Sequence, residues 1–85
     1  MGYRVTFAAG AKRQLEKLPK AAQQRLGEVI TKLSDDPRPP GVVKLSGEEG
    51  LYRVRSGDYR AIYRLEDDLM VVLVVKVGHR REIDR

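Results

Sequence analysis

The segment Leu51–Tyr63 reads LYRVRSGDYRAIY and concentrates side chains that can bind phosphate groups. It contains Arg53, Arg55 and Arg60. A guanidinium group donates paired hydrogen bonds that match two oxygens of a phosphate, whereas a lysine ammonium acts as a point charge. From Lys44 onward, seven of the nine basic residues are arginines. These residue types predict binding of a phosphate-rich polyanion, with an affinity that falls as salt rises.

The alternation of side chains along strands decides whether these arginines lie together. We predict strands at Leu51–Arg55 and Tyr59–Leu65, joined by a turn at residues 56–58 with glycine at a position that favours positive φ. One face then points toward the core and carries Tyr52, Val54, Tyr59, Ala61 and Tyr63. The opposite face is open and carries Arg53, Arg55, Arg60 and Arg64. The tail residues His79, Arg80 and Arg81 can extend this basic surface.

Arginines on an open sheet face can also serve solubility alone, paired with carboxylates such as Asp58, Glu66 or Asp67. Exposed ion pairs contribute only about 0–1 kcal/mol, so pairing would hardly explain the clustering. The pattern alone leaves both interpretations open.

The remaining pattern predicts a single α+β domain over residues 1–85, with the element order β-α-α-β-β-β. Tyr3–Phe7 alternates as a strand. Ala8–Leu18 and Lys20–Leu33 have helical spacing and are separated by Pro19, so they form an αα-hairpin that packs on one face of the sheet. The stretch SDDPRPPG ends the second helix, and residues 41–50 are predicted as loop.

Leu69–Val77 is apolar on both faces. We therefore place it as the third strand of an antiparallel meander, in the middle of the sheet and covered on both sides, ending at Gly78. The N-terminal strand joins the same sheet.

The bulk composition narrows the class of protein. The chain has 85 residues, a net charge of +5 and a pI of about 9.8, which favour an acidic partner such as nucleic acid, an anionic membrane surface or an acidic protein. There is no cysteine and one histidine, so we predict no metal site and no cofactor. The N-terminus lacks a signal-peptide pattern, and Leu69–Val77 is too short to span a bilayer as a helix. We expect a cytoplasmic protein with no membrane partner.

Several spaced motifs resemble one known family. They are KLPK at Lys17–Lys20, the proline-rich exit from the second helix, KLSG at Lys44–Gly47, YRVRSGDYRAIY at Tyr52–Tyr63 and VGHRREI at Val77–Ile83. Together they cover nearly the whole chain. The sequence resembles the RelE branch of the RelE/ParE toxins of bacterial type II toxin–antitoxin modules, which are similar in fold to microbial ribonucleases.

The resemblance implies a ribosome-dependent mRNA endonuclease that cuts in the A site by attack of a 2′-OH on the scissile phosphate. It also implies an acidic, RelB-like antitoxin that blocks the toxin, with operator DNA contacted only through the toxin–antitoxin complex. Ribosome and mRNA are the remaining partners. The extra C-terminal helix of several relatives is expected to be absent or minimal here.

The resemblance also assigns roles to residues. Arg60, in GDYR, and Arg80, in GHR, match the active-site arginines that clamp the phosphate and stabilise the transition state. Arg53 and Arg55 match basic residues that face the cleft and position the RNA backbone. Lys44 and Arg81 complete the expected RNA-binding set.

The chain departs from the family near its end, where many relatives have a tyrosine after GHR and this sequence has Ile83-Asp84. That tyrosine is a candidate base or stacking residue in the family, so its replacement predicts weaker cleavage. Arginine is a poor base because its pKa exceeds about 12. The candidates that remain for the proton acceptor are His79 and Asp84. The alternative is that both are ordinary surface residues without a catalytic role.

Two other functions fit the same resemblance. A ParE-like toxin would poison DNA gyrase without cutting RNA. A catalytically weak member would act mainly as an antitoxin-binding co-repressor. Ribosome cleavage, gyrase supercoiling and growth assays separate the three.

Overall fold

The computed structural model describes residues 2–47 and 49–83, and its elements follow the predicted α+β order with two additions. The strands are β1 (Arg4–Phe7), β2 (Val43–Lys44), β3 (Leu51–Ser56), β4 (Tyr59–Glu66) and β5 (Val71–His79). The helices are α1 (Ala9–Glu16), α2 (Lys20–Lys32) and α3 (Arg80–Ile83), with a 3₁₀ turn, η1, at Asp67–Leu69. Apart from η1, the additions are β2, within the predicted loop, and the short α3.

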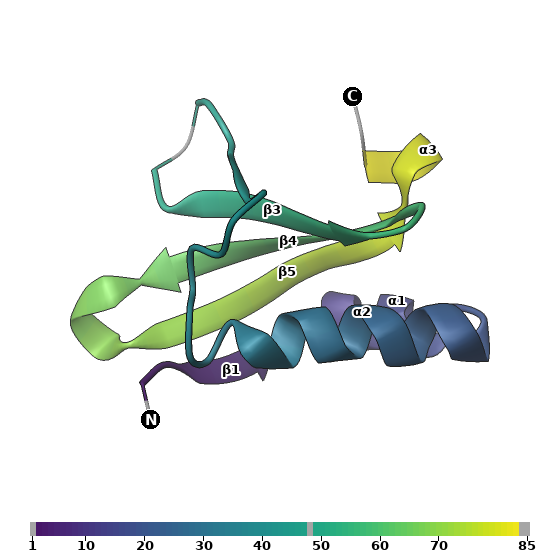
Figure 1. Cartoon of the computed structure of the whole chain (residues 1–85), viewed down its shortest axis with the longest axis horizontal. Coiled ribbons are helices and arrows are strands. Elements are labelled where there is room, and N and C mark those ends of the chain that lie inside the picture. The colour runs from purple at the N-terminus through teal and green to yellow at the C-terminus, as the bar shows by residue number, and fades with distance from the viewer. Residues whose placement is uncertain (1, 48, 84–85) are drawn as a thin grey trace.

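The strands form one sheet in the order β1-β5-β4-β3-β2. The meander β3-β4-β5 is antiparallel as predicted, and β1 joins it by pairing parallel to β5. Figure 1 shows α1 and α2 together on one face of the sheet, with α3 on the opposite side. We call these the helix face and the open face.

The core lies between the helix face and the αα-hairpin. Leu26, Ile30 and Leu33 recur at helical spacing on one side of α2 and are fully buried. The sheet contributes every second residue of its strands, and of these Tyr63 and Val74 are fully buried and face the helices. Replacing one of these leucines by alanine would cost about 2–5 kcal/mol, because the cavity does not fully collapse. This packing leaves the other face of the strands for polar side chains.

A β-bulge interrupts β5 and changes which side chains share a face. Ile62 pairs with Lys76, while the next residue, Tyr63, pairs with Val74, so Val75 is the extra residue. As a result Val74 and Val77 both point into the core although they are three residues apart. Residues after the bulge therefore point to the opposite side from the one that strict alternation gives.

Two expectations about β5 are wrong. The strand starts at Val71 rather than Leu69, because residues 67–69 form η1 and Met70 adopts a left-handed φ of 54°. It continues through Gly78 to His79, which pairs with Tyr59.

β5 lies inside the sheet, between β1 and β4, but helices α1 and α2 cover only one of its faces. Its open-face residues Val71 and Leu73 are only half-buried, so the expectation of cover on both sides is also wrong. The loop predicted over 41–50 contains β2, where Val43 pairs with Arg53 and Lys44 with Tyr52.

A polar network ties the proline-rich segment to the far end of the sheet. Arg38 donates to Asp67 Oδ2 at 2.9 Å and to the Tyr52 hydroxyl at 3.0 Å, and Tyr3 donates to Asp67 Oδ1 at 2.6 Å. Tyr63 donates to the Pro37 carbonyl at 2.6 Å, and burial raises its pKa above the ordinary value. The hydrogen bond from Arg38, followed by that from Tyr3, lowers the pKa of Asp67.

Asp67→Asn is expected to reduce the loss of thermal stability that follows a fall in pH. Since the folded pKa of Asp67 lies below its ordinary value, the ionised form stabilises the fold above about pH 4, and that stability is lost as pH falls further. Melting temperatures at neutral pH and at about pH 3 should differ less in Asp67→Asn than in wild type. Asp68→Asn, at the neighbouring exposed carboxyl, is the control. An unchanged difference in Asp67→Asn would contradict this role.

Candidate functional site

The open face of the meander carries a grid of side chains fixed by the strand register. Its three rows across β3, β4 and β5 are Arg55–Arg60–Gly78, Arg53–Ile62–Lys76 and Leu51–Arg64–Leu73. Residues directly opposite one another on antiparallel strands have Cβ atoms about 5 Å apart. Arginines from separate strands are therefore neighbours, as strand alternation predicts.

Arg60 is the most enclosed basic side chain on this face, with 7% of its surface exposed. Its Nη1 donates to the Gly57 carbonyl at 3.1 Å, in the turn between β3 and β4, where Gly57 has a φ of +62°. The helix α3 packs on the same side: a Cβ added at Gly78 would lie 2.8 Å from Glu82 Oε1 and 3.4 Å from Ile83 Cδ1. Arg60 is thus held at the turn end of the sheet, beside the tail helix.

Arg80 approaches the same end from the tail. Its N–H donates to the Asp58 carbonyl at 2.7 Å, and its Nε lies 3.8 Å from Asp58 Oδ1. The Arg80 and Asp58 side chains are 59% and 62% exposed, so this long ion pair holds the guanidinium only weakly. The β3–β4 turn therefore brings Arg55, Arg60 and Arg80 to one end of the molecule, and leaves Arg80 able to turn toward a ligand.

His79 does not join the arginines on the open face. It pairs with Tyr59 and lies on the helix face, with the two rings edge to face and their centroids 5.3 Å apart. The bulge at Val75 is the reason, because it reverses the orientation of the residues that follow it.

The other predicted site residues spread out. Lys44 pairs with Tyr52, so it points to the side opposite Arg53, and lines a hollow with Arg38 and Asp67 at the far end of the sheet. Arg81 is exposed on α3. Asp84 lies outside the described residues, and its role stays a prediction.

Lys76 is the basic open-face residue that sequence reasoning missed. It is exposed and lies in the row of Arg53, across Ile62. A signal was available, since strict alternation from Val74 would put a lysine into the core, which is costly without a partner. A bulge before Lys76 removes that conflict.

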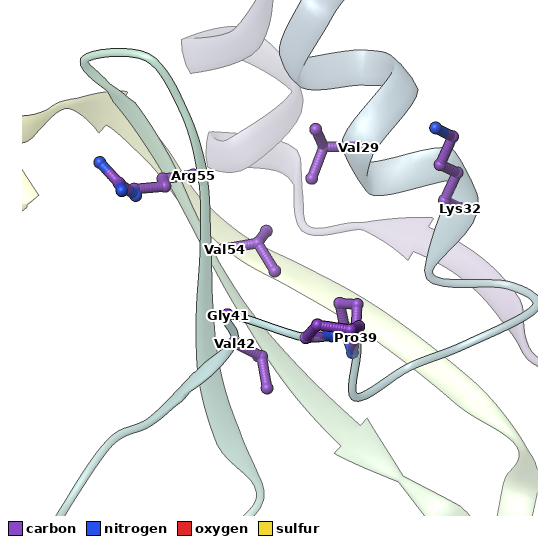
Figure 2. A pocket seen from close by; sticks show the side chains of 8 residues that line it. Val29, Lys32, Pro39, Gly41, Val42, Val54 and Arg55 are labelled. Carbon is purple, nitrogen blue, oxygen red and sulfur yellow. The ribbon is translucent and has the colours of Figure 1, made fainter.

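A separate groove runs between α2, the proline-rich segment and β3. It has a volume of about 310 Å³, and Val29, Val42 and Val54 form its apolar part, with Lys32 and Arg55 at its margin. We call Arg55, Arg60 and Arg80 the arginine cluster. Figure 2 shows Arg55 and Val54 pointing to opposite sides of β3, so Arg55 is the one member of the arginine cluster that lines the groove. Its apolar lining suits a protein segment better than a phosphate.

Clustered guanidinium groups at the turn end can bind a phosphate and stabilise extra negative charge on it. Arg53 and Lys76 extend the positive charge by one row along the open face, so the surface offers cations to more than one phosphate of a nucleic-acid backbone. Within residues 2–47 and 49–83 no three His, Asp or Glu side chains gather as metal ligands, and no helix is long and apolar enough to cross a membrane.

Proteins with similar sequences are toxins of toxin–antitoxin systems. Residues 5–84 match the profile of the ParE toxin of the type II toxin–antitoxin system parDE. A putative RelE-like toxin protein of Escherichia coli is 34% identical over 86 residues, covering 99% of this chain and 90% of that protein. The mRNA interferase toxin RelE of Escherichia coli is 30% identical over 82 residues, covering 94% of this chain and 85% of that protein.

A solved structure gives the same answer for the fold. The archaeal RelE of a RelE–RelB complex from Pyrococcus horikoshii has a TM-score of 0.82 to this chain and 36% sequence identity. The match covers 94% of this chain and 97% of that one.

Proposed function

Because this chain belongs to the family of ParE toxins of type II toxin–antitoxin systems, and is a RelE-like member of it, we propose that it is a ribosome-dependent mRNA endonuclease. It cuts mRNA in the ribosomal A site in the cytoplasm, and a RelB-like antitoxin neutralises it. The name of one relative, mRNA interferase toxin RelE, supports the reaction class. The observation that carries the proposal is the meeting of Arg55, Arg60 and Arg80 at the β3–β4 turn.

The reaction follows from what such a cluster can do. A 2′-OH attacks the adjacent phosphorus, loses its proton to a base, and forms a phosphorane with additional negative charge. The bond to the 5′-oxygen then breaks as an acid gives that oxygen a proton, leaving a 2′,3′-cyclic phosphate and a 5′-hydroxyl. Arg60 and Arg80 would stabilise the phosphorane, an effect worth about 3–4 kcal/mol per well-placed donor in comparable oxyanion sites. None of these steps requires a metal ion or an organic cofactor.

The remaining open-face cations would hold the RNA backbone on either side of the reacting phosphate. Arg53 and Lys76 lie one row away from Arg55 and Arg60 along the strands. Each phosphate contact adds to the salt dependence of binding. For single strands, the logarithm of the affinity falls by about 0.7 per contact for each unit of log salt concentration. The ribosome would supply the geometry of the mRNA.

The test is addition of purified toxin to ribosomes that translate a defined mRNA, followed by primer extension. We expect new 3′ ends within the A-site codon, and none on the same mRNA without ribosomes. An intact A-site codon at toxin concentrations that arrest translation would refute the proposal.

Gyrase poisoning is the second candidate, because the profile that matches residues 5–84 is that of a ParE toxin. Inhibition of gyrase supercoiling without RNA cleavage would select it. If the protein shows neither activity, and cells that express it without antitoxin grow normally, the role that remains is that of an antitoxin-binding co-repressor.

The antitoxin partner fits the groove between α2 and β3. A RelB partner is present in the complex that contains the archaeal relative. We propose that an acidic, amphipathic antitoxin segment lays apolar side chains on Val29 and Val54 and carboxylates near Lys32. Operator DNA would be contacted only by the resulting complex.

Lys32→Glu is expected to weaken antitoxin binding about tenfold at low salt and less at high salt, because it sets like charges against each other. Lys20→Glu, at an exposed lysine outside the groove, is the matched control. Isothermal titration with the purified antitoxin measures both. Equal affinities for the two variants would remove the groove from the interface.

A further inference from the structure

The start of α3 is closed by two reciprocal hydrogen bonds between His79 and the helix. The Arg81 N–H donates to His79 Nδ1 at 3.1 Å, and the His79 N–H donates to Glu82 Oε1 at 3.2 Å. This is a variant of the capping box: Glu82, the third residue of α3, accepts from the capping residue as usual, while the capping residue accepts from the second helical residue instead of the third. Here the capping acceptor is an imidazole nitrogen instead of the usual side-chain oxygen.

The capping box fixes the turn that leads from β5 to the open face. Arg80 is the first residue of α3, and its N–H is bound by the Asp58 carbonyl at 2.7 Å. The side chains of Glu82 and Ile83 lie against Gly78, which stands opposite Arg60 in the sheet register. The box therefore sets both the starting point of the Arg80 side chain and the packing of α3 beside Arg60.

We propose that His79 and Glu82 are positioning residues for the arginine cluster, and that His79 acts as a helix cap rather than as the base that accepts the 2′-OH proton. The inference rests on the proposed nuclease function. Two observations carry it: the Nδ1 lone pair is used by the Arg81 N–H, and the imidazole ring packs on Tyr59 on the helix face. A base for the 2′-OH would have to lie on the side of Arg60.

The cap requires a side-chain atom that accepts a hydrogen bond. In a neutral histidine one ring nitrogen accepts and the other donates, so the bond from the Arg81 N–H assigns the accepting role to Nδ1.

The discriminating pair of variants is His79→Asn and His79→Ala. Asparagine is a good helix cap that does not titrate, so His79→Asn should cleave ribosomal mRNA within about threefold of wild type, while His79→Ala, which has no acceptor, should lose about fivefold or more in kcat. Loss of a general base would instead cost about 10²–10⁴-fold in both variants.

A second readout does not need the nuclease activity. In ¹⁵N-labelled protein, hydrogen exchange of the Arg81 amide should accelerate in His79→Ala and not in His79→Asn, because only alanine lacks an acceptor for this N–H. Equal exchange in both variants would overturn the cap, whatever the protein does to RNA. Cleavage by wild type with equal loss in the Asn and Ala variants would overturn the positioning role while leaving the nuclease proposal intact.

Discussion

Arg60→Lys is expected to reduce ribosome-dependent cleavage about 10²–10³-fold, the size of effect seen when one oxyanion donor is removed. Lysine keeps the positive charge and lacks the planar pair of donors, so the loss measures the guanidinium geometry. Arg60 suits this role because only 7% of its surface is exposed and its Nη1 is held by the Gly57 carbonyl at 3.1 Å. Its orientation is fixed before RNA arrives, and a fixed donor needs no reorganisation in the transition state.

The conservative replacement is chosen because Arg60 is buried. Arg60→Ala would remove packing and a hydrogen bond together, at a cost of about 1–3 kcal/mol in stability, and would mix folding with activity. Cleavage rates and melting temperatures of Arg60→Lys should be measured beside those of Arg25→Lys, at an exposed arginine on α2. Cleavage by Arg60→Lys at the rate of Arg25→Lys would show that Arg60 does not touch the transition state.

Arg80→Ala is expected to lower cleavage about 10²-fold with almost no change in melting temperature. The side chain is 59% exposed and its ion pair with Asp58 is 3.8 Å long, so the folded state loses little when it is removed. The backbone N–H that binds the Asp58 carbonyl remains in the variant. The effect of Arg80→Ala should therefore appear in kcat, measured at saturating ribosome concentration.

Asp58→Asn is the control for Arg80. It removes the charge of the weak ion pair and keeps the backbone carbonyl that binds the Arg80 N–H, so most of the cleavage activity should remain. If Arg80→Ala cleaves mRNA as fast as Asp58→Asn does, Arg80 is only a surface charge, and the arginine cluster consists of Arg55 and Arg60.

Sequence alternation correctly places the β3 and β4 arginines on one face because the hairpin between them is local. The two-residue turn at Gly57 and Asp58, one residue shorter than predicted because Ser56 pairs with Tyr59, sets the register in which Arg55 stands opposite Arg60. The helices are predictable for a similar reason. Their apolar positions repeat at 3.6-residue spacing, and Pro19 and the proline-rich segment mark where they end.

The errors in the sequence interpretation come from pairing between distant segments. The bulge at Val75 depends on how β5 fits β4, and it moves His79 to the helix face and Lys76 to the open face. Strand β2 has two residues and is defined by its pairing with β3, so no local pattern reveals it. The four-residue α3 is too short to show periodicity, although His79 and Glu82 have the spacing of a capping box.

In the proposed reaction, the cluster of Arg55, Arg60 and Arg80 promotes attack by an RNA 2′-OH on the adjacent phosphate. The most direct measurement compares two mRNAs on programmed ribosomes, identical except for a 2′-deoxy nucleotide on the 5′ side of the mapped cut. We expect cleavage of the all-ribose mRNA, with a 2′,3′-cyclic phosphate end, and no cleavage at the deoxy position. Cutting of the deoxy mRNA at an undiminished rate would contradict the proposed reaction.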